Sequence, residues 1–138
     1  MNERVIARAH RILKRLPRYR SVVGTAGPML PWVQELSLPT GEVLIGVYEN
    51  VPGEPTESIA ITDRGLHVFR NGTWEFVGYE QIDRIETPSG KAGVEELVVH
   101  LLSGKVSRIP VRGGRERFHD AFEVLRFLDR VTSDRHAK

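Results

Sequence analysis

Hydrophobic and polar positions alternate with a period of two through the middle of the chain. Val43, Ile45 and Val47 show the pattern first, and such alternation is typical of strands that bury one face. The later segments keep it in the groups Ile59 and Ile61, Leu66 and Val68, Trp74 and Phe76, Leu97, Val99 and Leu101, and Ile109 and Val111. The pair Asn71-Gly72 favours a tight two-residue hairpin. The isoleucines of the segment at 82–85 are instead three positions apart, which predicts a bulged strand.

A helical period replaces the two-residue period near both ends of the chain. Residues 2–16 carry apolar side chains three and four positions apart, which predicts an amphipathic helix that Pro17 stops. A second helix is predicted after Gly113-Gly114, and its apolar side carries Phe118, Ala121, Phe122, Leu125, Leu128 and Val131. The whole pattern predicts a mainly β fold: seven antiparallel strands in a barrel or sandwich, capped by a C-terminal helix and preceded by an amphipathic helix.

The length of 138 residues suits one hydrophobic core. We divide the chain into a basic helical extension at 1–20, a connector at 21–40, a β-domain at 41–133 and a short tail at 134–138. The connector holds three prolines, two glycines and a single charged residue, which is typical of a segment without regular structure.

Four segments of the β-domain carry a resemblance to a known family: IAITDRGL at 59–66, YEQIDRI at 79–85, the strand and turn at 97–104, and the helix at 118–128. In this order they resemble bacterial pleckstrin-homology-like (PH-like) domains of the GRAM-related branch. The resemblance implies a non-catalytic scaffold that binds lipids, peptides or proteins. Its phosphoinositide-binding members use Lys and Arg between the first two strands, whereas the loop at 49–57 here has three glutamates and no basic residue. Inositol phosphate binding through that pocket is therefore not expected.

Charge is distributed unevenly along the chain, although the net charge is only +2. Residues 1–20 hold seven Lys and Arg against one Glu, residues 21–102 hold four against twelve Asp and Glu, and residues 103–138 hold nine against five. Both ends are thus basic and the strands acidic. The candidate residues for binding a partner or an anion are Arg4, Arg8, Arg11, Arg15, Arg18, Arg112, Arg115 and Arg117.

These candidates form two groups. The first five fall on one stripe of the N-terminal helix, with Arg18 included only if the helix continues past Pro17. The last three surround Gly113-Gly114, where a helix N-terminus could hold an anion. The alternative for this glycine pair is a simple turn between the last strand and its helix.

The sequence offers no pattern for catalysis, and we predict no catalytic residue, metal or cofactor. The absence of cysteine excludes disulfides, thiolate metal sites and a cysteine nucleophile. The five histidines lack the spacing of a helical zinc site, and we expect His67 and His100 to be at the surface or half-buried. Glu95 and Glu96 are adjacent on a strand and therefore point to opposite faces.

The basic N-terminus has no apolar signal segment, so we expect a soluble, cytoplasmic protein. The favoured function is a binding or adaptor module for a protein partner. One alternative is a peripheral module on the inner face of the membrane that binds anionic lipid through the N-terminal helix, although that helix lacks aromatic residues on its apolar side. Another is a small toxin-neutralising, immunity-type protein. Nucleic acid is disfavoured because no aromatic residues accompany the arginines, and a homo-oligomer stays open.

Overall fold

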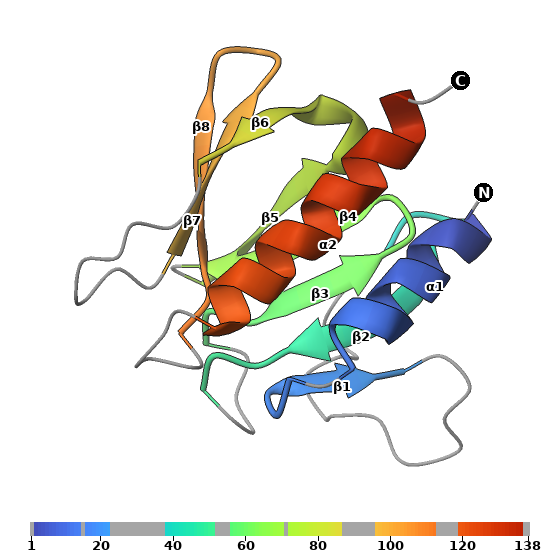
Figure 1. Ribbon diagram of the computed structural model, residues 1–138. Coiled ribbons are helices and arrows are strands. Elements are labelled where there is room, and N and C mark those ends of the chain that lie inside the picture. The colour runs from blue at the N-terminus through green and yellow to red at the C-terminus, as the bar shows by residue number, and fades with distance from the viewer. Residues whose placement is uncertain are drawn as a thin grey trace.

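The computed structural model describes residues 2–14, 16–22, 38–51, 56–70, 72–86, 96–112 and 119–136. Within these ranges the chain forms two antiparallel sheets and two α-helices (Figure 1). The elements in chain order are α1 (Asn2–Ile12), β1 (Tyr19–Ser21), β2 (Leu44–Tyr48), β3 (Ile59–Thr62), β4 (Gly65–Arg70), β5 (Thr73–Gly78), the 3-10 helix η2 (Tyr79–Gln81), β6 (Ile82–Ile85), β7 (Glu96–Leu101), β8 (Val106–Pro110) and α2 (His119–His136).

The first sheet has the strand order β1-β2-β3-β4-β5 and the second has the order β6-β7-β8. The predicted mainly β architecture with a C-terminal helix is confirmed. The described residues contain eight strands rather than the predicted seven, because β1 adds a short strand beside β2, and the two sheets do not close into a barrel. The predicted irregularity at 82–85 is confirmed, since the register between β6 and β7 shifts between Ile82 and Arg84.

The N-terminal helix is shorter than predicted. It ends at Ile12, because Pro17 lacks an amide hydrogen and disfavours helical geometry at the residue before it. The chain then turns, with the amide of Leu16 bonded to the carbonyl of Leu13 and that of Tyr19 bonded to the carbonyl of Leu16. Arg18 therefore lies in the turn just before β1 and not on the arginine stripe of the helix. At the other end α2 continues to His136, beyond the expected start of the tail.

Both helices contribute to the hydrophobic core. They lie side by side across the five-stranded sheet (Figure 1), and α2 also packs on η2, β6 and β7. The aromatic rings of Tyr79 and Phe127 meet edge to face at a centroid distance of 6.1 Å. The helix residues buried in this core are Val5, Ala9 and Ile12 of α1 and Ala121, Val124, Phe127, Leu128 and Val131 of α2.

Strand β5 turns the face opposite to the predicted one towards the core. Val77 is fully buried, whereas Phe76 is 44% exposed and Trp74 is only partly buried. The cause is the register with β4, which pairs the core residue Leu66 with Val77. Phe122 of α2 is likewise 41% exposed, outside the buried stripe of its helix.

Candidate functional site

The helical arginine candidates lie on the surface of a docked helix. Arg4 and Arg11 are exposed and Arg8 is half-buried, while the opposite side of α1 is buried in the core. Arg15, Arg115 and Arg117, like the Gly113-Gly114 pair, lie outside the described residues.

Arg18 and Arg112, which are far apart in the sequence, meet at Asn50. The guanidinium of Arg18 donates a 2.7 Å hydrogen bond to the Asn50 carbonyl, and the amide of Arg112 donates a 2.6 Å bond to Oδ1 of Asn50. The Asn50 side chain in turn donates to the carbonyls of Glu57 and Pro110. Asn50 is only 4% exposed, so its polar atoms need these partners. Sequence reasoning missed Asn50, since nothing in the local pattern marks it.

The guanidinium of Arg112 is engaged by Glu57. Its Nε and Nη2 atoms donate to the two carboxylate oxygens at 2.6 and 2.8 Å, a bidentate ion pair. The hydrogen bond from Arg112 lowers the pKa of Glu57; partial burial opposes this, and the charges of Arg112 and Arg70 add to it. The Arg112 guanidinium thus already binds a carboxylate. This ion pair connects the loop before β3 with the segment that follows β8.

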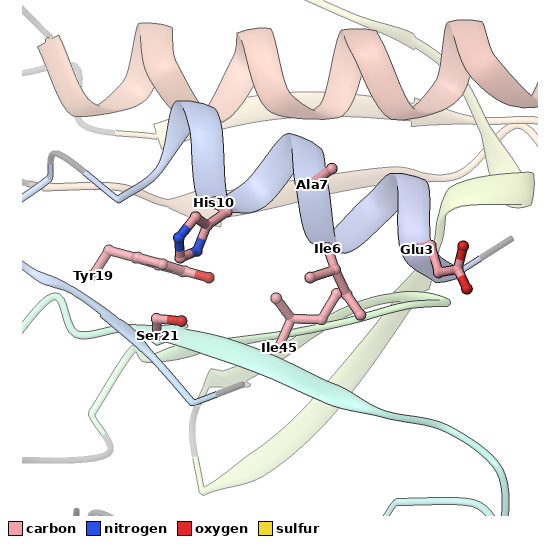
Figure 2. A pocket seen from close by; sticks show the side chains of 7 residues that line it. All are labelled: Glu3, Ile6, Ala7, His10, Tyr19, Ser21 and Ile45. Carbon is pink, nitrogen blue, oxygen red and sulfur yellow. The ribbon is translucent and has the colours of Figure 1, made fainter. Parts of the chain in front are cut away.

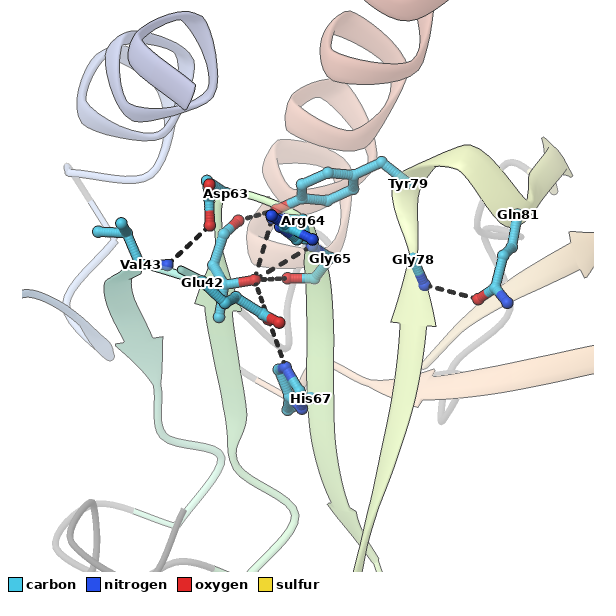
Figure 3. A network of polar contacts seen from close by, with 10 residues as sticks. Glu42, Val43, Asp63, Arg64, Gly65, His67, Gly78, Tyr79 and Gln81 are labelled. Atoms are coloured by element: carbon cyan, nitrogen blue, oxygen red, sulfur yellow. Dashed lines mark hydrogen bonds and ion pairs between the residues drawn. The ribbon is translucent and has the colours of Figure 1, made fainter. Parts of the chain in front are cut away.

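A second polar cluster surrounds Glu42 (Figure 3). Its carboxylate accepts a 2.6 Å hydrogen bond from the Thr62 hydroxyl and lies 2.7 Å from Nε2 of His67. His67 is only 7% exposed, so the prediction of a surface or half-buried histidine is wrong. The carboxylate supplies the partner that lets a polar ring lie inside the structure. His100, by contrast, is half-buried as predicted and lies 2.6 Å from Glu86, whose pKa it lowers by hydrogen bonding.

The combination of Thr62, Glu42 and His67 does not have the geometry of nucleophilic catalysis. The Thr62 oxygen accepts hydrogen bonds from the amides of Arg64 and Gly65 at 3.1 and 3.2 Å. Its lone pairs therefore point into the turn between β3 and β4 rather than towards a substrate. The histidine contacts the carboxylate instead of the hydroxyl, so it cannot take the hydroxyl proton directly. This cluster holds the turn in place.

A pocket with a volume of about 360 Å³ lies between α1 and the strands β1 and β2 (Figure 2). Ile6, Ala7 and Ile45 form its apolar lining. The polar side chains Glu3, His10, Tyr19 and Ser21 complete it, with Glu3 at one end and the other three gathered at the opposite end. The volume falls in the range of roughly 300–1,000 Å³ that is typical of small-molecule sites.

Tyr19 is the most constrained polar residue of this pocket. Its side chain is 7% exposed, and its hydroxyl makes no hydrogen bond in the described part of the chain. Burial raises the pKa of this hydroxyl far above its usual range, so it stays protonated. The ring lies over Gly46 of β2, where any side chain would overlap the hydroxyl. Sequence reasoning missed the pocket, since Tyr19 fell within the supposed helical extension.

Among the described residues, no three His, Asp or Glu side chains converge in a way that could hold a metal ion. Neither of the helices described combines the length and the apolar character needed to cross a membrane. No family model matches the chain, and the comparisons with curated proteins and with solved structures found no match.

Proposed function

We propose that the protein is a non-catalytic PH-like binding module that engages a protein partner through the basic side of α1. The observation that carries the proposal is the docking of this helix. Val5, Ala9 and Ile12 are buried in the core, so α1 holds Arg4 and Arg11 in fixed positions at the surface. A rigid basic surface complements an acidic surface on another protein, which speeds and orients association.

The element order supports the PH-like part of the proposal. Seven strands, β2 to β8, precede the long helix α2, and α2 packs against η2, β6 and β7 of the second sheet. This is the order on which the resemblance to PH-like domains rests. Scaffolds of one fold serve many functions, so the partner surface is inferred from α1 and not from the fold.

The docking of α1 also weighs against membrane insertion. A helix in a membrane interface buries its apolar side among the lipid chains. In α1 this side is already buried against α2 and β2, and exposing each large apolar residue would cost about 1.5–3 kcal/mol. Lipid binding by α1 would then depend on the arginine charges alone.

The experiment compares three forms of the full chain in the native host. The test variant carries Arg4→Glu, Arg8→Glu and Arg11→Glu. A matched control reverses three exposed charges elsewhere: Arg84→Glu on β6, Lys105→Glu before β8 and Arg130→Glu on α2. Crosslinking in cells followed by quantitative mass spectrometry measures the proteins attached to each form. We expect recovery of the partner to fall at least tenfold with the test variant and to stay unchanged with the control.

Thermal unfolding of all three forms shows that each is folded. Equal recovery of every attached protein with the test variant and the wild type would overturn the proposal. Sedimentation with vesicles of anionic phosphatidylglycerol, compared with neutral phosphatidylcholine, separates the membrane alternative. Vesicle binding that is lost in the test variant, without any change in attached proteins, would favour that alternative instead.

A further inference from the structure

The pocket beside α1 has two polar ends of different chemistry, with an apolar surface between them. From one end to the other its lining consists of Glu3, then Ile6, Ala7 and Ile45, and then His10, Tyr19 and Ser21 (Figure 2). Glu3 is the only Asp, Glu, Lys or Arg in this lining. Glu3 and His10 are seven residues apart on α1, so the ends are separated by about 10 Å at 1.5 Å per helical residue.

The carboxylate of Glu3 has no ion-pair partner in the described part of the chain. Ion pairs within a helix form between residues three or four positions apart. The residues at these positions after Glu3 are Ile6 and Ala7, and neither carries a charge. This side of α1 therefore presents a negative charge without a counter-charge next to an apolar surface. The group that complements it is a cation on an apolar chain.

The positive charges of α1 oppose a cation in the pocket less than Glu3 favours it. The helix N-terminus carries about half an elementary charge, less than the full charge of the carboxylate. At about 100° per residue, the arginines are centred roughly a third of a turn away from the side that carries Glu3 and His10. Arg4 and Arg11 are exposed, so water weakens their repulsion of a cation. Arg4 and Arg8 also make interactions of their own.

The opposite end of the pocket offers hydrogen-bonding groups without a formal charge at Tyr19 and Ser21. The Tyr19 hydroxyl points from the pocket edge towards Ile6 and Ile45, below the ring of His10 (Figure 2). Burial raises the pKa of this hydroxyl, so it stays protonated and can both donate and accept a hydrogen bond. A hydroxyl group on an occupant complements it in both roles.

We propose that this pocket binds a small linear amine that carries a hydroxyl at its far end. The ammonium group pairs with Glu3, and the hydroxyl exchanges a hydrogen bond with Tyr19. The alkyl chain between them lies against Ile6, Ala7 and Ile45. The inference goes beyond the proposed partner binding and does not depend on it, because it uses the side of α1 that faces β1 and β2.

The test titrates the full chain with aminohexanol, hexanediol and hydroxyhexanoate, followed by amide chemical shifts in NMR. All three carry a hydroxyl at one end of a six-carbon chain, and the other end is cationic, neutral or anionic. We expect saturable binding of aminohexanol with shifts centred on α1 and β1. Hexanediol should bind about threefold more weakly, as the loss of an exposed ion pair predicts. Hydroxyhexanoate, which brings a second carboxylate to Glu3, should bind at least about tenfold more weakly.

Two variants assign the ends of the ligand. Glu3→Gln removes the charge and keeps the size, so aminohexanol should lose its advantage over hexanediol. Asp129→Asn is the matched control, since Asp129 is exposed on α2 outside the pocket lining, and it should leave that advantage unchanged. Tyr19→Phe keeps the ring and removes the hydroxyl, and it should weaken both compounds about threefold.

A third variant locates the site. Ala7→Trp fills the pocket from an exposed helix position and should abolish binding, whereas Ser133→Trp, at an exposed position on α2, should leave it unchanged. The proposal is overturned if aminohexanol does not saturate or if hexanediol binds the wild type as tightly. It is also overturned if the advantage of aminohexanol survives in Glu3→Gln, or if Tyr19→Phe binds both compounds like the wild type.

Discussion

The hydroxyl of Tyr48 on β2 donates a 2.7 Å hydrogen bond to Oδ2 of Asp120 in the first turn of α2. The two residues are 72 positions apart in the sequence, and both are buried. A carboxylate inside a protein needs hydrogen-bond donors because it has lost its contact with water. This bond therefore fixes the N-terminal end of α2 relative to the five-stranded sheet.

Replacing Tyr48 by Phe should destabilise the protein by about 1–3 kcal/mol. The ring stays in place, but Asp120 loses the only hydrogen bond that its side chain makes in the described part of the chain. Urea unfolding at neutral pH measures the change in the free energy of unfolding. Tyr79→Phe is the matched control, since its hydroxyl bonds a neutral backbone carbonyl, and it should cost less. A larger loss for Tyr79→Phe would contradict this prediction.

Asn50→Ala should be among the most damaging single polar substitutions, with a loss of about 2–4 kcal/mol. The change removes both donors to the carbonyls of Glu57 and Pro110 and the acceptor of the Arg112 amide. Three backbone groups would then each lose a hydrogen-bond partner at a position that is almost fully buried. The measurement is again urea unfolding, and a loss below about 1 kcal/mol would mean that water replaces the lost bonds.

The ion pair of Glu57 and Arg112 predicts a stability that depends on pH in the acidic range. Because the folded state lowers the pKa of Glu57, chiefly through the Arg112 hydrogen bond, the unfolded chain binds the proton more readily. The stabilisation is therefore complete at pH values above 4.5, the ordinary pKa of this carboxyl group, and it is lost as the pH falls below that value. Both side chains are about one-third exposed, so water screens the pair and we expect no more than about 1 kcal/mol.

Glu57→Gln provides the readout for this dependence. The difference in unfolding free energy between wild type and variant should shrink as the pH is lowered from neutral to about 3. In a background of Arg112→Gln the same comparison should give a much weaker pH dependence, because only the charge of Arg70 then lowers the pKa of Glu57. A slope that persists undiminished in this background would assign the effect to another group.

The sequence predicts buried strand faces well where apolar residues occupy one face only. Ile59, Ile61, Leu97 and Val99 are all buried in the core as the two-residue period indicates. The prediction of the buried face fails in β5: Trp74 and Phe76 share the predicted face, but Val77 on the opposite face is the residue that is buried. Apolar residues occur there on both faces, since Phe76 contacts His67 and Trp74 contacts Phe69 on the side away from the core. Periodicity alone cannot decide between two apolar faces.

Only part of the candidate sites could be predicted from the sequence. The arginines of α1 follow from a count of charges and from helical spacing. The pocket does not, because it needs the pairing of β1 with β2, which joins Tyr19 to Tyr48 across the connector. A three-residue strand shows too short an alternation to be recognised, and its partner is set by tertiary contacts rather than by local propensity.

Gly46→Ala should destabilise the protein by about 1–3 kcal/mol, because a methyl group on this residue would overlap the Tyr19 hydroxyl and ring. Either the ring or the β1–β2 pairing, in which Ser21 lies opposite Gly46, must then move. Urea unfolding of the single variants and of the double variant with Tyr19→Ala tests this cause. If the overlap is responsible, Gly46→Ala should lower the free energy of unfolding of the Tyr19→Ala variant by at least about 1 kcal/mol less than it lowers that of the wild type. Equal costs in both backgrounds would instead assign the loss to the backbone of β2, independently of Tyr19.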